Sequence, residues 1–215
     1  LANVLIRAAA TDITASDIDS VSSTTVRPRA RIGGGTATSS GPQIVTTPPA
    51  SPYDGQEILL EVDATNGIYW HFRFRSASGS AYKWEFMGGA ALLAEVTAAE
   101  ATGGTTYAAL TTAGPSIALP RGGDYDVEIG AHVSCDVGNE RGLMSYDIGA
   151  TAAVDADALK LGTGSGGTEG AEFEGSRARR KTALTAITLT AKYKHELTAV
   201  TFSNRWMRVT PVRIS

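Results

Sequence analysis

The stretch Asp124-Tyr125-Asp126-Val127-Glu128-Ile129-Gly130-Ala131 carries the clearest structural pattern of this chain. In an extended chain, successive side chains point to opposite faces. One face of this stretch therefore takes the apolar residues Tyr125, Val127, Ile129 and Ala131. The other face takes the acidic residues. This alternation predicts a half-buried strand of an antiparallel sheet.

Similar segments follow one another through the C-terminal half, with turn signals every 8–12 residues or so, the spacing of a sandwich or jelly roll. The further strands that we expect are 116–119, 141–150, 156–161, 183–193, 197–202 and 205–213. No convincing amphipathic helix interrupts them, which disfavours a βαβ architecture. The sequence predicts an all-β protein with a C-terminal jelly-roll-like β-sandwich at 105–215.

Residues 53–104 are expected to form an antiparallel β-meander and a connector. Asp54-Gly55 and Asn66-Gly67 are tight-turn dipeptides. Strands are expected at 57–63, 67–76 and 82–88, and their aromatic residues share one face. Nothing in so small a meander covers that face, so we expect a partner to cover it, most simply a symmetry-related copy. Segment 90–101 has helix-forming composition but also suits a strand, and its state stays open.

The N-terminal part has a different character. Residues 1–32 are too few for a core of their own. They are interpreted as an attachment segment, with a solvated tail as the alternative. Residues 33–52 are rich in Gly, Pro, Ser and Thr, a composition typical of a linker.

Composition excludes several classes of function. The net charge is -3 and 19% of residues are charged, which gives no basic surface for nucleic acid. No apolar run is long enough for membrane insertion. The single Cys135 cannot form an intrachain disulfide, so we expect assembly in a reducing cytoplasm.

The glycines of the C-terminal half do not indicate a nucleotide site. Gly162, Gly164 and Gly167 have the spacing of a dinucleotide-binding fingerprint. The acidic segment 168–175 that follows is broken by glycines and would repel a phosphate. We interpret this region as a loop between strands. The adjacent basic run 177–181 suits an anionic glycan or phosphate, or a solvated loop, and we favour the loop.

No residues form a recognisable catalytic or metal site. The three histidines lie in separate expected strands, and His132 and Cys135 would face opposite sides of one strand. Ser145 lacks the glycine-flanked turn of a serine nucleophile. A pair of carboxylates from distant strands stays open. We expect no enzyme, no cofactor and no bound metal.

Three segments carry a resemblance to a known family: Pro52-Tyr53-Asp54-Gly55-Gln56-Glu57, Gly67-Ile68-Tyr69-Trp70-His71-Phe72-Arg73-Phe74 and Ala81-Tyr82-Lys83-Trp84-Glu85-Phe86-Met87-Gly88-Gly89. Together they resemble minor tail proteins and tail fibres of tailed phages of actinobacteria and related hosts. Segments 112–116, 123–131 and 144–146 are similar to the jelly-roll domain that often follows in those proteins. The resemblance covers 52–89 well, 105–215 moderately and 1–32 weakly.

The resemblance implies an intertwined homotrimeric virion protein that meets the host surface. The residues implied at the trimer interface are Ile68, Trp70, Phe72, Phe74, Tyr82, Trp84 and Phe86. Residues 1–32 would bind other virion proteins. The loops 136–140 and 162–180 would contact a host glycan or protein, with Asp136, Asn139, Glu140, Glu172, Arg177, Arg179 and Arg180 as candidate residues.

Two other classes of protein remain as alternatives. One is a purely structural head fibre, decoration or baseplate protein without receptor binding. The other is a tail-borne depolymerase. A host-adsorption competition separates receptor binding from the structural role, and release of reducing ends from a host polysaccharide would indicate the enzyme.

Overall fold

The computed structural model describes residues 42–136, 140–162 and 170–215. In these ranges the chain forms thirteen β-strands and one short 3-10 turn, η1 (Asp155–Asp157). They build a nine-stranded sheet, called the large sheet below, and a four-stranded sheet, called the small sheet. The expectation of an all-β protein is confirmed. Among the described residues, no helix is long and apolar enough to cross a membrane.

The meander is formed by β2 (Glu57–Asp63), β3 (Ile68–Phe74) and β4 (Trp84–Gly89), with β1 (Gln43–Val45) parallel to β2 at the edge. The turn between β2 and β3 uses Gly67 at φ +64°. Asp63 supports it, because one of its carboxylate oxygens accepts hydrogen bonds from the backbone N–H groups of Thr65 at 3.0 Å and Asn66 at 3.1 Å. All three strands of the meander lie where the sequence predicts them.

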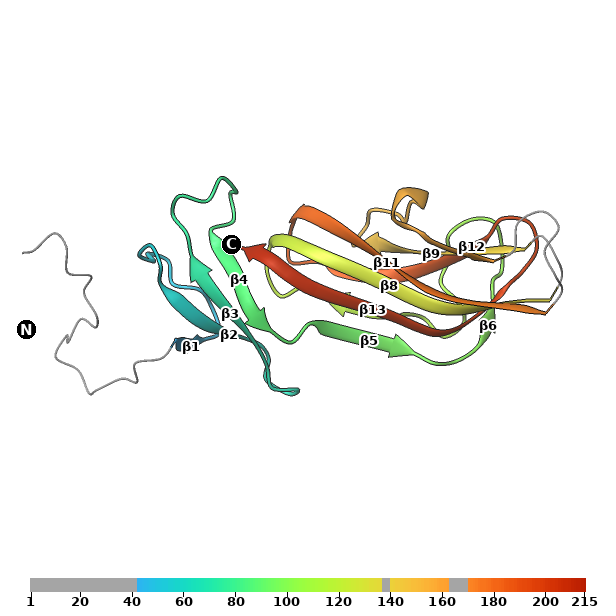
Figure 1. The fold of residues 1–215 in the computed structure, drawn as a ribbon, viewed down its shortest axis with the longest axis horizontal. Coiled ribbons are helices and arrows are strands. Elements are labelled where there is room, and N and C mark those ends of the chain that lie inside the picture. The colour runs from blue at the N-terminus through green and yellow to red at the C-terminus, as the bar shows by residue number, and fades with distance from the viewer. Residues whose placement is uncertain (1–41, 137–139, 163–169) are drawn as a thin grey trace, which may run out of the picture. The chain divides into compact units, whose positions relative to one another are not determined.

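The sandwich pairs two layers. The large sheet contributes β5 (Leu92–Val96), β6 (Glu100–Ala101), β8 (Gly123–Cys135), β11 (Ala171–Leu184) and β13 (Thr201–Ile214). The small sheet contains β7 (Ser116–Ala118), β9 (Arg141–Ile148), β10 (Leu159–Gly162) and β12 (Thr188–His195). In Figure 1, β11, β8 and β13 run as long neighbouring ribbons.

The strand order defines a jelly roll. When β5 and β6 are counted as one strand, the sandwich part of the large sheet has the order 1-8-3-6 and the small sheet has the order 2-7-4-5. Eight strands arranged in this way form the two nested Greek keys of a jelly roll. Residues 105–215 do not form it alone, because the first strand is supplied by β5 and β6.

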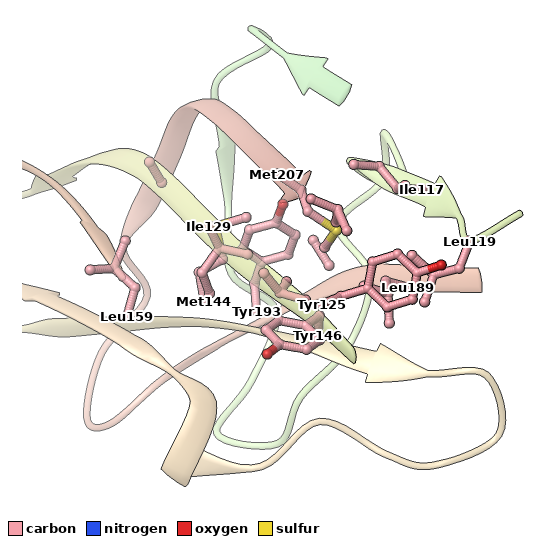
Figure 2. Packing of buried hydrophobic residues seen from close by; sticks show 14 of the residues in the cluster. Ile117, Leu119, Tyr125, Ile129, Met144, Tyr146, Leu159, Leu189, Tyr193 and Met207 are labelled. Carbon is pink, nitrogen blue, oxygen red and sulfur yellow. The ribbon is translucent and has the colours of Figure 1, made fainter. Parts of the chain in front are cut away.

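Meander and sandwich share one hydrophobic core. Residues 42–215 form one compact unit, so the expected boundary between 104 and 105 does not separate two domains. β4 hydrogen-bonds to the end of β13, which makes the meander an extension of the large sheet. Figure 2 shows the core of the sandwich, in which residues of both sheets meet: Tyr125, Ile129 and Met207 from the large sheet and Met144, Tyr146, Leu189 and Tyr193 from the small sheet.

The aromatic face of the meander is covered largely within the chain. Trp70 and Phe72 are fully buried and Trp84 is 3% exposed, so the expectation that a partner must cover these three rings is wrong. The ring of Trp70 lies 6.3 Å from that of Tyr125 in β8. Trp70 also donates an Nε1 hydrogen bond of 2.7 Å to the carbonyl oxygen of Ala90. The other candidate interface residues, Ile68, Phe74, Tyr82 and Phe86, are half-buried.

Segment 90–101, whose state the sequence leaves open, forms the strands β5 and β6. Three further expectations need correction. Residues 43–45, expected in a linker, form β1. Residues 201–214 are one bulged strand instead of parts of two. Residues 171–184, expected to be largely loop, form the edge strand β11. The expected attachment segment 1–32 lies outside the described residues.

Candidate functional site

One tryptophan lies on the outer face of the large sheet. In β13, Met207 and Val209 are fully buried in the core. Trp206 alternates with them and therefore points outward. It stands opposite Gly130 of β8 on one side and Glu95 of β5 on the other. The outer face also carries Asp126 and Glu128 of β8, Arg208 and Thr210 of β13, and Glu174, Ser176, Ala178 and Arg180 of β11.

The indole of Trp206 rests on Gly130. A Cβ added to this glycine would lie 2.2, 2.3 and 2.5 Å from Cε2, Cζ2 and Nε1 of the ring. Three ring atoms at nearly equal distance mean that the flat face of the indole lies over the glycine. The opposite face points away from the sheet, and Trp206 is partly exposed. We name the outer face of the large sheet around this ring the Trp206 face.

The other two tryptophans belong to the hydrophobic core. Trp70 and Trp84 are buried, and the Trp70 N–H has a carbonyl partner. In the described part of the chain, the indole N–H of Trp206 has no such partner. A partly exposed ring with an available N–H donor combines an apolar surface with a polar group, as binding sites for small ligands do.

A hollow of about 220 Å³ opens beside the ring of Trp206. Its lining consists of Glu95, Val96, Thr97, Glu174, Asn204, Arg205 and Trp206. These residues come from β5 and the position that follows it, from β11 and from β13, which are brought together by pairing across the large sheet. We call it the Trp206 hollow. Its two carboxylates, its amide and its aromatic ring supply several hydrogen-bonding groups around one apolar surface.

A β-bulge in β13 shapes the floor of the Trp206 hollow. Between Ser203 and Trp206 the register with β8 shifts, and Asn204 adopts φ 45°. The bulge turns Arg205 inward, where it is fully buried. Its guanidinium donates hydrogen bonds of 3.3 Å to the carbonyl oxygens of Thr112 and Ala98. Bulges of this kind often re-aim side chains next to binding sites.

A second hollow of about 290 Å³ lies on the same face and is lined by Asp126, Glu128, Ala178, Arg208 and Thr210. Ion pairs cross it from strand to strand. Arg180 donates two hydrogen bonds of 2.8 Å to the carboxylate of Asp126, and this partner raises the pKa of Arg180 above its ordinary value. Arg208 binds Glu128, which also accepts a 2.9 Å hydrogen bond from Ser176.

The candidate receptor residues do not gather in one place. Asp136 is exposed, but Glu140 is only 2% exposed and is therefore poorly placed to contact a receptor. Asn139 lies outside the described residues. The register with β8 places the exposed Glu172 on the outer face of β11.

The basic run 177–181 belongs to a strand rather than a loop. Arg177, Arg179 and Lys181 pair with residues of β8 that face the core, so they point toward the small sheet. Arg177 donates a 3.0 Å hydrogen bond to the carbonyl oxygen of Ala156, and Lys181 forms an ion pair of 2.5 Å with Asp157. Of the four basic residues, only Arg180 points to the Trp206 face.

The histidines have separate partners. Each ring shares one hydrogen bond with a neighbouring side chain. Nε2 of His71 lies 3.0 Å from Oε2 of Glu57, Nδ1 of His132 lies 3.0 Å from Oγ of Ser203, and Nδ1 of His195 lies 2.8 Å from Oγ1 of Thr102. Within the described ranges, no group of three His, Cys, Asp or Glu residues could hold a metal ion.

A larger groove of about 660 Å³ lies beside the turn between β2 and β3. Apolar side chains dominate its lining, among them Val62, Ile68, Leu92, Ile117 and Pro120. Ile68 is the one candidate interface residue that lines it. The groove lacks an exposed aromatic ring flanked by hydrogen-bonding groups, so the Trp206 face is the better candidate for a ligand site.

The strand order places the chain in the class of jelly-roll proteins, and the Trp206 face is its candidate ligand site. No family model matches the chain, and no curated protein matches its sequence. Among solved structures, it is similar to a carbohydrate-binding module from Cellvibrio mixtus lichenase 5A in complex with cellotriose. The identity is 15% over 58% of this chain and 99% of that chain, with a TM-score of 0.29.

Viral capsid proteins are also among the similar structures. For the VP2 subviral particle of infectious bursal disease virus, the identity is 10% over 72% of this chain and the TM-score is 0.33. For the Gt strain of the same virus, the identity is 8% over 73% of this chain and the TM-score is 0.29. The chain spans 41% and 47% of the length of these two proteins.

Proposed function

We propose that this chain is a non-enzymatic virion protein, a phage tail fibre or minor tail protein, that binds a host-surface glycan through the Trp206 face. The sequence resemblance supports the place in the virion and the assembly as a homotrimer in the host cytoplasm. The indole of Trp206 supports the glycan, because one of its faces lies on Gly130 and the other is open to a ligand.

A sugar ring suits this surface. Its C–H groups are apolar and pack on the face of an aromatic ring, while its hydroxyl groups need hydrogen-bond partners. The indole N–H donates, the carboxylates of Glu95 and Glu174 accept, and the amide of Asn204 does both. A shallow site of this kind binds weakly by itself. Three copies that engage a repetitive surface together would raise the apparent affinity by a factor of roughly 10²–10⁴.

The test is a glycan array probed with the purified full-length chain and two variants. We expect the wild type to bind at least one class of glycan and Trp206→Ala to lose that binding. Trp206→Tyr keeps an aromatic ring and should retain part of it. The matched control is Tyr53→Ala, which removes an aromatic residue that is 70% exposed elsewhere on the surface.

Two results would overturn the proposal. One is an array on which no glycan binds the wild type. The other is glycan binding that Trp206→Ala leaves unchanged, which would move the site elsewhere. If the wild type binds no glycan and Trp206→Ala no longer assembles, the purely structural role is favoured instead. The Trp206 face would then be buried between subunits.

A further inference from the structure

We infer that the Trp206 hollow selects its glycan by charge, binding sugars with a free amine most tightly, neutral sugars less tightly and carboxylated or sulfated sugars least. This inference rests on the proposed glycan-binding function. It adds the chemical class of the ligand, which the position of the aromatic ring alone does not determine.

Two exposed carboxylates stand beside the ring. Glu95 is the neighbour of Trp206 on β5, and Glu174 reaches the hollow from β11. Neither of them makes an ion pair within the part of the chain that the structure describes, so both keep their charge available to a ligand. The two carboxylates come from opposite sides of β13, because Glu95 lies on β5 and Glu174 lies on β11 beyond β8.

The one cation in the lining does not offset these acids. Arg205 is fully buried and its guanidinium is directed to the carbonyl oxygens of Ala98 and Thr112. Its Nη2 also lies 3.9 Å from the carboxylate of Glu100. The positive charge is therefore opposed by an acid outside the hollow and is turned away from a ligand on the outer face.

The neighbouring cations of the Trp206 face are paired as well. Arg208 binds Glu128 and Arg180 binds Asp126. On β8, His132 stands opposite Glu174 of β11. Its Nε2 lies 3.7 Å from the carboxylate of Glu172, and its Nδ1 shares a hydrogen bond with Ser203. The hollow is left with two net negative charges, those of Glu95 and Glu174.

The consequence for a ligand follows from elementary electrostatics. An ammonium group gains attraction from both carboxylates and from the face of the indole. A hydroxyl group donates a hydrogen bond to a carboxylate without a change in charge. A carboxylate or sulfate on the ligand is repelled. Each exposed charge pair contributes weakly and two carboxylates act together, so we expect a preference of roughly three- to tenfold at each step.

The experiment presents the same sugars in three charge forms. Hexosamines, N-acetylhexosamines and hexuronic acids of the glucose and galactose series are arrayed and probed with the full-length chain in low salt and in high salt. Binding by the amine form should exceed that by the N-acetyl form, which should exceed that by the acid. Salt should reduce the differences, because the charges are exposed.

Charge-neutral variants test whether Glu95 and Glu174 cause the preference for the amine form. In the double variant Glu95→Gln and Glu174→Gln, which keeps size and hydrogen-bonding capacity, the preference for the amine should fall to about twofold or less. Glu172→Gln is the matched control, because it removes one exposed acid from β11 outside the hollow. It should leave the order of the three forms unchanged.

Each result has a separate meaning. Acidic sugars that bind as tightly as neutral ones through Trp206, or a preference that survives in the double variant, would overturn the charge selection and leave glycan binding standing. An array on which no sugar binds would overturn the proposed function, and the charge selection with it.

Discussion

Gly130→Ala should displace the indole of Trp206 without removing it. The new Cβ would lie 2.2 Å from Cε2, 2.3 Å from Cζ2 and 2.5 Å from Nε1. Carbon atoms in contact are separated by about 3.5–4.0 Å, so the ring has to retreat by at least about 1 Å. The space on its outer side allows that movement, whereas the sheet beneath is held by hydrogen bonds on both sides of β8.

The expected magnitude follows from two opposing effects. Overpacking costs about 1–3 kcal/mol, and exchanging a strand glycine for alanine recovers about 0.5–1 kcal/mol. The free energy of unfolding should therefore fall by about 1 kcal/mol. Aromatic stacking contributes about 0.5–1.5 kcal/mol, so glycan affinity should fall by roughly two- to tenfold when the ring is tilted.

Denaturant unfolding and glycan titration measure the two quantities, and tryptophan fluorescence reports the new environment of the ring. Gly88→Ala is the control, because a Cβ at this strand glycine would meet nothing within 4 Å. It should be neutral or slightly stabilising and should leave binding intact. A Gly130→Ala protein with unchanged fluorescence, stability and affinity would refute the placement of the indole on Gly130.

Three further predictions concern stability and assembly. Trp84→Ala should lower the free energy of unfolding by about 3–5 kcal/mol whatever the protein concentration, because the ring is buried within one chain; a loss that depends on concentration would place it between subunits. Hydrogen bonds from Arg73 and Lys194 hold the pKa values of Glu57 and Asp155 below their ordinary range. Their contribution should be complete above the unfolded pKa of about 4 and lost as the pH falls through the lower folded values, and Glu57→Gln should weaken that acid dependence in unfolding curves. Light scattering should give three times the chain mass of 22.3 kDa, whereas the mass of one chain would exclude the homotrimer.

Alternation of apolar and polar residues made most strands predictable. It succeeds where one face of a strand is buried, as in β8 and in the three strands of the meander. It failed for β11, whose inner face carries Arg177, Arg179 and Lys181. At the margin of a sandwich, a strand can point charged side chains inward and still reach solvent, so its sequence has the composition of a loop.

The domain boundary could not be predicted from local sequence. β5 and β6 pair with β13, a hundred or more positions away along the chain. β4 likewise pairs with the last residues of β13. Because of these pairings, the meander joins the core of the sandwich, and most of its aromatic face is covered without a partner. Pairings between segments so far apart in the sequence cannot be inferred from the local pattern of either segment.

The candidate site was missed although its residues follow the same alternation rule. Trp206 shares the polar face of its strand with Arg208, and Gly130 shares the polar face of its strand with Glu128 and His132. A tryptophan on a polar face is unusual, because burial of such a ring is strongly favourable. A glycine within an alternating strand often marks a close approach of another group. Neither residue predicts a binding site by itself. The pairing of β13 with β8 places Trp206 beside Gly130, and only this register shows that the two residues belong to one surface. That surface carries the proposed glycan site.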